Sequence, residues 1–257
     1  SPMSTIKTRE DFTGFKFDSV SNVREPTLAG PSALPIAILT SDWHLQHTAP
    51  TCRGEKGTDW YEVMENAVLQ LKDASDFHGV PVVIAGDIFD RWNSPPELIN
   101  FAISLLKLFN HPVYAIPGQH DLPNHNYNDM HKGAYGTLVK AGAIKTLGPG
   151  EPTYHHQSYN ESKSFYMWGF PWGSKITHRR DLACHPCVDL AVIHAYCWVE
   201  GKRHAEAKLE QRLAEWDSIW DSILNKAGYQ IAVFGDNHQG FYYSSQGKAR
   251  VESMMNC

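Results

Sequence analysis

The sequence has no long apolar run. Its uninterrupted apolar stretches are all shorter than ten residues, whereas a membrane-spanning helix needs about 20. We therefore expect no transmembrane segment and no membrane partner. The N-terminus also lacks a basic segment followed by an apolar one, so the sequence predicts no secretory signal peptide. Ser1 and Pro2, which precede Met3, are interpreted as a cloning remnant and left out of the fold prediction.

Cysteine is sparse and cannot be fully paired. The five cysteines are an odd number in a chain of 257 residues, which is typical of reduced thiols in the cytoplasm and not of a disulfide framework. Cys184-His185-Pro186-Cys187 has the spacing of a zinc site. No second cysteine pair completes the four ligands, and we interpret this stretch as a loop.

Positive charge is also in short supply. The chain has 23 Lys and Arg against 28 Asp and Glu, and its formal net charge is −5. This balance argues against an extended basic surface for nucleic acid. A nucleic-acid substrate is not excluded, because two bound divalent cations would add about four positive charges where a phosphate must bind.

The composition is that of a globular α/β protein, with 42% hydrophobic and 20% charged residues. Residues 1–35 are polar and rich in turn formers, and we predict an N-terminal extension or linker there. Residues 36–257 are long enough for one domain with a two-sheet core and helices outside.

Strands and helices alternate along the first half of this domain. Apolar stretches predict buried strands at 36–40, 80–85 and 112–116. The segments between them predict helices at 59–77, capped by Asp59, and at 94–109, which begins with prolines. Further elements are predicted at 134–141 and 202–226 (helices), 143–147, 188–193 and 230–234 (strands), 153–170 (antiparallel strands), and 240–244 with 249–255 (a hairpin).

Polar side chains follow five of the strands at the point where each strand ends. Val82–Ala85 is followed by Gly86, which allows the chain to turn out of the sheet, and then by the carboxylate of Asp87. Since the carboxyl ends of parallel strands meet at one edge of a sheet, we expect these side chains to converge. Carboxylates, amides and imidazoles together predict a two-metal hydrolytic site centred on Asp87.

In chain order the polar strand ends read D-x-H (42–44), G-D-x-x-D (86–90), G-Q-H-D (118–121), a lone histidine (194) and G-D-x-H (235–238). This order resembles the calcineurin-like metallophosphoesterases, whose pattern is D-x-H, G-D-x-x-D, G-N-H-D, H, G-H-x-H. The resemblance covers about residues 36–244. It implies a four-layer α/β/β/α sandwich with two mixed sheets flanked by helices, and it implies two divalent metal ions as cofactors.

The resemblance also implies a role for each motif residue. The first metal ion would be held by Asp42, His44 and His238, and Asp87 would bridge both ions. His120 would stay off the metals and face the leaving group. In the implied reaction an activated water attacks phosphorus in line, and His120, positioned by a neighbouring carboxylate, donates a proton to the departing alkoxide.

The second metal ion would be held by Gln119, His194 and Asp236. Two of these ligands depart from the family pattern, since Gln119 stands in place of Asn and Asp236 in place of the first His of G-H-x-H. A carboxylate in place of an imidazole favours Mn²⁺ or Mg²⁺ over Zn²⁺. We therefore expect Mn²⁺, with Mg²⁺, Fe²⁺ and Zn²⁺ as the alternatives.

Other polar residues near the motifs have two alternative roles each. Asp90 and Asp121 either orient the metal ligands as a second layer or form turn hydrogen bonds. His47, His125 and His131 lie on nearby loops, where substrate contact and a solvated position are both open, with the solvated position favoured.

Within the family, residues 86–90, 111–121 and 137–144 resemble most the nuclease subunit of SbcC–SbcD-type complexes, including phage-encoded relatives. This implies a manganese-dependent DNA exonuclease involved in DNA repair, with single-strand endonuclease activity as an addition. It also implies DNA as substrate, an SbcC-like ATPase partner if the native chain is longer, a homodimer, and the cytoplasm of a bacterium or phage-infected cell. The family's nucleases normally continue well beyond the last motif, whereas this sequence ends 19 residues after His238; a truncated chain and a minimal nuclease both fit.

Two other functions compete with the nuclease. A phosphoesterase or pyrophosphatase acting on a small nucleotide or lipid-linked nucleotide would share these motifs, and residues 198–226 would serve as its apolar lid. A scaffold that keeps the fold without the chemistry is the second alternative. His120 favours an enzyme, because scaffolds commonly lose the acid and several ligands, whereas every ligand position here is chemically competent.

Overall fold

The computed structural model describes residues 35–51, 59–158, 160, 163–177, 179, 188–196, 228–236 and 238. All of them belong to the larger of two compact units of the chain, residues 34–242 with 251–257. The predicted extension up to residue 34, the helix at 202–226, the hairpin after 240 and the Cys184–Cys187 loop lie outside the described residues. The boundary between extension and domain stays a prediction.

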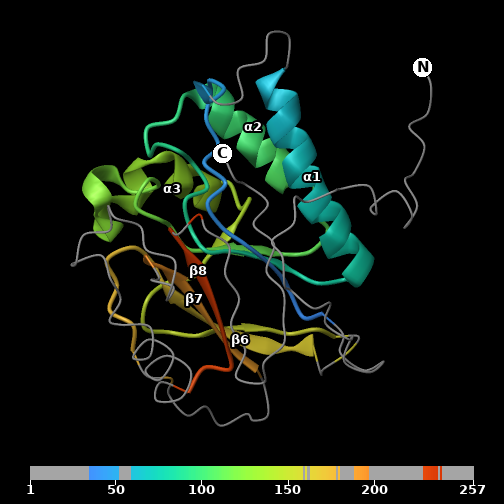
Figure 1. Cartoon of the computed structure of the whole chain (residues 1–257). Coiled ribbons are helices and arrows are strands. Elements are labelled where there is room, and N and C mark those ends of the chain that lie inside the picture. Colours follow the sequence, from blue (N-terminus) through green and yellow to red (C-terminus); the bar gives the residue numbers. More distant parts are fainter. Residues whose placement is uncertain are drawn as a thin grey trace, which may run out of the picture. The chain divides into compact units, whose positions relative to one another are not determined.

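The first sheet is parallel, with its strands in the order of the chain. Its strands are β1 (Ile38–Thr40), β2 (Val82–Ile84), β3 (Val113–Ala115) and β4 (Lys145–Thr146). The connecting helices are α1 (Trp60–His78), α2 (Pro96–Leu106) and α3 (Ala134–Lys140). This confirms the predicted alternation, and α1 and α2 lie side by side along the sheet (Figure 1).

Local capping fixes where α1 begins and ends. The side chain of Asp59 accepts a hydrogen bond from the backbone amide of Tyr61 at 3.0 Å. Gly79 ends the helix in the left-handed conformation, at φ 62°, and its amide returns to the carbonyl groups of Ser75 and Asp76. In α2, Pro96 occupies the first turn, where no backbone amide is needed.

The second sheet contains strands of both directions. Its strands are β5 (Thr153–His155), β6 (Phe165–Phe170), β7 (Val188–His194) and β8 (Ile231–Gly235). β5 and β6 pair antiparallel, as the aromatic stretch at 153–170 predicts, and β6, β7 and β8 run parallel. Among the described strands, the second sheet is therefore mixed and the first is entirely parallel, whereas the resemblance implies two mixed sheets.

Both faces of the central strand β2 are buried. Val83 packs with Phe165 and Val192 between the two sheets. Val82 and Ile84 pack on the other face of the strand, in the core that α1, α2 and α3 cover. This double burial explains why the strand is continuously apolar instead of alternating. The predicted α/β fold with two sheets and flanking helices is therefore confirmed.

Two short 3₁₀ helices, η3 (Pro123–His125) and η4 (Tyr127–Lys132), lie between β3 and α3, where the sequence predicts no element. They follow the Gln119-His120-Asp121 segment directly and so belong to the loops at the carboxyl edge of the first sheet. Among the described helices, none combines the length and the apolar character that crossing a bilayer requires.

Candidate metal centre

Asp87 lies at the centre of the polar loops, immediately after β2, and is 1% exposed. Its Oδ1 accepts a hydrogen bond from the backbone amide of His120 at 2.9 Å. Two glycines leave room for it. A Cβ on Gly118 would lie 2.1 Å from Asp87 Oδ1, and a Cβ on Gly86 would lie 2.2 Å from His194 Nδ1. No larger residue fits at these two positions without displacing a candidate ligand.

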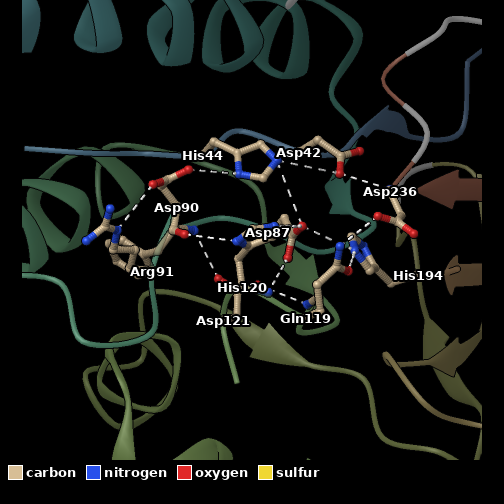
Figure 2. A network of polar contacts seen from close by, with 12 residues as sticks. Asp42, His44, Asp87, Asp90, Arg91, Gln119, His120, Asp121, His194 and Asp236 are labelled. Carbon is tan, nitrogen blue, oxygen red and sulfur yellow. Dashed lines mark hydrogen bonds and ion pairs between the residues drawn. The ribbon is translucent and has the colours of Figure 1, made fainter. Parts of the chain in front are cut away.

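The second oxygen of Asp87 faces three imidazoles. Oδ2 lies 3.3 Å from His194 Nε2, 3.8 Å from His44 Nε2 and 4.0 Å from His120 Nε2 (Figure 2). It has no hydrogen-bond partner among the described residues. Burial works to raise the pKa of Asp87, but the three histidines outweigh it and hold the pKa below its usual value. A buried, ionised oxygen that faces three imidazoles fits a bridging metal ligand.

The candidate ligands of the first metal ion lie close together. His238 Nε2 lies 3.7 Å from Asp42 Oδ1 and 3.1 Å from His44 Nε2. Asp42, His44 and His238 offer ligand atoms that all lie within 4.8 Å of one another. One carboxylate oxygen and two imidazole nitrogens are a donor set that suits a divalent transition metal.

Asp90 lies beside His44. Its Oδ1 is 3.5 Å from His44 Nδ1 without hydrogen-bond geometry, and the other ring nitrogen of His44 faces Asp42 and Asp87. Burial lowers the pKa of His44, although Asp87 works in the opposite direction. The neutral imidazole is the form that binds a metal ion. Of the two alternative roles of Asp90, the ligand-orienting one agrees with this proximity.

At the second metal position, three acceptor atoms converge. His194 Nδ1 donates to the carbonyl oxygen of Ala85 at 2.6 Å, which leaves Nε2 pointing at Gln119 Oε1, 2.7 Å away, and at Asp87 Oδ2. Burial works to lower the pKa of His194, but the adjacent Asp87 carboxylate raises it to about 9. In the metal-free protein a proton on Nε2 therefore links the three atoms. A metal ion can take that proton's place.

Asp236 does not join these clusters. Its Oδ1 accepts a hydrogen bond from Gln119 Nε2 at 2.7 Å, and its backbone amide donates to Asp42 Oδ1 at 2.9 Å. Burial raises the pKa of the Asp236 carboxyl. The two residues that depart from the family pattern are thus bonded to each other, and Asp236 holds the Gln119 amide so that its oxygen faces His194 (Figure 2).

His120 lies beside the ligands, with its side chain 44% exposed. Its Nδ1 is 3.1 Å from the carbonyl oxygen of Asp90, and its Nε2 is directed toward Asp87. The predicted neighbouring carboxylate is therefore wrong as the positioning group, and a backbone carbonyl takes this role. Asp121 points away into the protein and is fully buried.

Asp121 ties two loops together. Its carboxylate accepts hydrogen bonds from the backbone amides of Gly118, Ile88 and Phe89, at 3.0, 3.2 and 2.9 Å. Burial and the nearby Asp87 raise its pKa, while the three amides act in the opposite direction. Turn hydrogen bonding, one of its two predicted roles, is the one that the structure shows.

The three loop histidines have separate environments. His47 Nδ1 lies 2.9 Å from the hydroxyl of Tyr61, and His131 Nδ1 lies 3.2 Å from the carbonyl of Asn128. The ring of His125 contacts that of Trp172, with centroids 6.5 Å apart. Trp172 is absent from the sequence prediction, although the Pro171–Ser174 turn formers after an aromatic strand mark its position.

Left-handed backbone concentrates at this centre. Among the described residues, six other than glycine have positive φ, and four of them are candidate site residues: Asp42, His44, Asp87 and Asp236. Asp, Asn and His tolerate this region better than most residues do, and such conformations gather at functional sites. The sequence signal for this backbone is weak, because it consists only of the residue types.

The sequence model of the calcineurin-like phosphoesterase family matches residues 37–240 of this chain. The chain therefore belongs to the calcineurin-like phosphoesterase family. Members of this family hydrolyse phosphoesters with divalent metal ions, and the clustered carboxylates and imidazoles fit such ions.

The comparison with curated proteins returned no match. Among solved structures, 43 chains match. One of these, a crystal structure, is 12% identical over 77% of this chain and 82% of its own chain, with a TM-score of 0.41.

Proposed function

We propose that this metal-dependent phosphoesterase is a nuclease of the SbcD type that hydrolyses phosphodiester bonds in DNA. The observation that carries the proposal is the placement of His120. Its exposed imidazole is held through Nδ1 by the Asp90 carbonyl and directs Nε2 toward the cluster. A deoxyribose alkoxide is a poor leaving group and needs a proton as the P–O bond breaks. An imidazole in this position can donate that proton.

Other residues of the chain would hold the metal ions and align the substrate. When bound, two divalent cations would neutralise the phosphate and supply a nucleophile at neutral pH. Asp42, Asp87 and His44 hold negative charge and nitrogen donors at fixed positions, because Asp90, the two glycines and the left-handed backbone leave them little freedom. This fixed geometry is what aligns a phosphodiester with His120.

Two features support DNA over a small nucleotide. The stretches 86–90 and 111–121 resemble the nuclease subunit of SbcC–SbcD-type complexes. Arg91 adds an exposed guanidinium next to Asp90, with its Nε 3.8 Å from Asp90 Oδ2 and its side chain 81% exposed (Figure 2). Such a group suits the backbone phosphates that flank a scissile bond. Association with an SbcC-like ATPase belongs to the same proposal and would show as co-purification of the two proteins.

The test is hydrolysis by the manganese-loaded protein of labelled linear, nicked and single-stranded DNA, beside nucleoside diphosphates and bis-p-nitrophenyl phosphate. We expect stepwise shortening of the DNA. His120→Asn should lower the DNA rate by about 10²–10⁴-fold and the nitrophenyl rate much less, since nitrophenolate leaves without a proton. Turnover of nucleotides with intact DNA would contradict the nuclease, and equal losses on both ester types would deny His120 the acid's role.

A further inference from the structure

Trp172 lies at the corner of a tight turn that follows β6. The amide of Ser174 donates to the carbonyl of Pro171 at 2.9 Å, and Gly173 has φ 79°. These are the marks of a type II turn with Trp172 at its second position. The amide of Trp172 also donates to the carbonyl of Pro117 at 3.3 Å, which ties the turn to the loop that carries Gln119 and His120.

The far end of the same segment is anchored to the second sheet. The carbonyl of Thr177 accepts a hydrogen bond from the hydroxyl of Tyr229 at 2.9 Å. Arg179 Nη1 lies 3.3 Å from Oδ2 of the fully buried Asp189. Because the segment is held at both ends, the backbone that carries Trp172 has a fixed place before any substrate arrives.

Two aromatic rings border Trp172. The His194 ring lies 6.3 Å from it at an interplanar angle of 67°, and the His125 ring lies 6.5 Å from it at 86°. His194 is buried under the candidate second metal position, while Trp172 is half-buried and His125 exposed. The pair Trp172 and His125 thus extends from the metal centre toward solvent.

The backbone of the loop that carries His125 is unusual. Asn124 and His125 have φ 53° and 56°, two consecutive left-handed residues without a glycine. The amide of His125 donates to the carbonyl of Leu122 at 3.0 Å, which closes the turn directly after Asp121. Residues in this conformation persist where the surroundings hold them, and they cluster at ligand sites.

From these observations we infer that Trp172 and His125 form a stacking subsite for the nucleobase next to the scissile phosphate. The inference rests on the proposed function, because it places a nucleotide phosphate at the metal centre. One sugar separates a base from its phosphate, so a phosphate beside His194 brings the base against the neighbouring indole. Aromatic faces bind every base through its π-surface, and the subsite therefore tolerates any DNA sequence.

The test compares two chromogenic esters that release the same nitrophenolate. Thymidine 5′-(p-nitrophenyl phosphate) carries a base, and methyl p-nitrophenyl phosphate does not. For the manganese-loaded protein we expect kcat/KM to favour the thymidine ester by about 5- to 150-fold, the span of base–aromatic stacking. Trp172→Leu keeps apolar bulk against His194 but has no aromatic face. It should lose most of this preference and leave the methyl ester unchanged.

Three further variants sharpen the comparison. Trp172→Phe should keep most of the preference, and His125→Ala should lose part of it. Phe77→Ala, which removes an aromatic side chain that is 83% exposed at the end of α1, should change neither ester. Calorimetric binding of thymidine 5′-monophosphate against inorganic phosphate to the metal-loaded protein gives the same comparison without turnover.

Equal losses on both esters in Trp172→Leu, or loss of bound metal, would reduce Trp172 to a support for His194 and overturn the subsite. So would a wild-type protein that shows no preference for the base in either turnover or binding. Failure of the nuclease proposal looks different, because DNA would then stay intact while the ester preference persists.

Discussion

At the scale of single residues, the centre depends on two positions that have no side chain. Gly118 allows Asp87 Oδ1 to approach within 2.1 Å of where a Cβ would stand. Gly86 does the same for His194. Gly118 also has an ordinary backbone conformation, since its φ is not positive. Substitution there consequently tests the steric requirement without adding backbone strain.

We predict that Gly118→Ala displaces the Asp87 carboxylate and weakens manganese binding by at least tenfold, because the added methyl group would lie 2.1 Å from Asp87 Oδ1 and 2.6 Å from the Asp87 backbone nitrogen. The matched control is Gly148→Ala, whose added methyl group would lie 3.6 Å from the hydroxyl of Tyr127, an ordinary contact. Isothermal titration calorimetry with Mn²⁺ measures both variants. Wild-type affinity in Gly118→Ala would show that the carboxylate has room to move.

Gln119 and Asp236 form one functional unit if their hydrogen bond positions the amide. We predict that Asp236→Ala and Gln119→Ala each weaken the second metal ion and that the double variant is no weaker than the worse single variant. Residues that act through one another behave in this non-additive way. Metal titration of the four proteins measures the cycle. Additive losses would instead make Asp236 an independent ligand, the role that the family resemblance implies.

The protonation state of His194 predicts how many protons metal binding releases. Its pKa of about 9 means that the metal-free protein carries a proton there at pH 7.5. A metal ion must displace that proton. We therefore expect binding at the second metal position to release roughly one proton at pH 7.5, and this number should fall toward zero as the pH rises past 9. Calorimetry in buffers of different ionisation enthalpy measures the count. A buffer-independent enthalpy at pH 7.5 would contradict the protonated state.

The same shift affects the stability of the metal-free fold. The folded pKa of about 9 lies above 6.5, the ordinary pKa of a histidine, so this proton stabilises the folded state fully below about pH 6.5. That contribution is lost as the pH rises through 9. Bound metal removes this loss between about pH 6.5 and 9, because the imidazole is then neutral in the folded protein.

At the scale of elements, Asp121 joins the loop after β2 to the loop after β3. We predict that Asp121→Asn lowers the free energy of unfolding by roughly 1–3 kcal/mol, because an amide nitrogen replaces one accepting oxygen and a backbone amide loses its partner in the interior. Asp129→Asn is the control, since among the described residues Asp129 forms an ion pair with Lys132, 2.6 Å away, and exposed pairs contribute about 1 kcal/mol or less. Urea denaturation compares the two, and similar losses would mean that Asp121 is not a structural link.

The elements themselves could be predicted largely from the sequence, because their signals are local. Asp59 and Pro96 mark helix starts, and apolar runs mark the strands. The predicted end of the second helix at 109 is three residues beyond Leu106, since turn hydrogen bonds from Leu108 and Phe109 continue past the α-helix. The 3₁₀ helices were missed because the Pro123–Lys132 stretch has turn-forming composition and no helical period.

From the sequence one can predict which residues meet at the candidate centre, but not which contacts each of them makes. Parallel strands bring their carboxyl ends to one edge, so the proximity of Asp42 and Asp87, which follow β1 and β2 of the first sheet, comes from topology. His194 ends β7 of the second sheet, and its place beside them depends on how the two sheets pack. The partner of Asp236 does not follow, because Gln119 lies 117 positions away and side-chain direction decides the contact. Trp172 is not predicted from the sequence, because aromatic residues next to a core strand usually contribute to packing.

At the scale of the whole molecule, the negative charge matters most. With a formal charge of −5, the metal-free protein should repel DNA, while two divalent cations would bring the charge close to neutral and concentrate positive charge at the site. We predict that chelation abolishes hydrolysis and DNA binding and lowers the melting temperature, since ligands that bind only the folded state stabilise it.

Mn²⁺ should restore all three properties better than Zn²⁺, because carboxylate and amide oxygens make up much of the donor set. Thermal denaturation and gel-shift titration follow the recovery. Full activity in excess chelator, with no metal found by elemental analysis, would contradict the metal-dependent reaction.

The ligands come from both ends of the chain. Asp42, His44 and Asp87 follow the first two strands, whereas His194 is the last residue of β7 and His238 follows β8, more than a hundred residues later. On the ribosome the early ligands therefore emerge long before their partners. A nascent chain that ends after β4 carries four of the seven candidate ligands, Asp42, His44, Asp87 and Gln119, so we expect high-affinity metal loading to be a late event of biosynthesis. The wrong metal ions of the cell then have little opportunity to be trapped before the protein is complete.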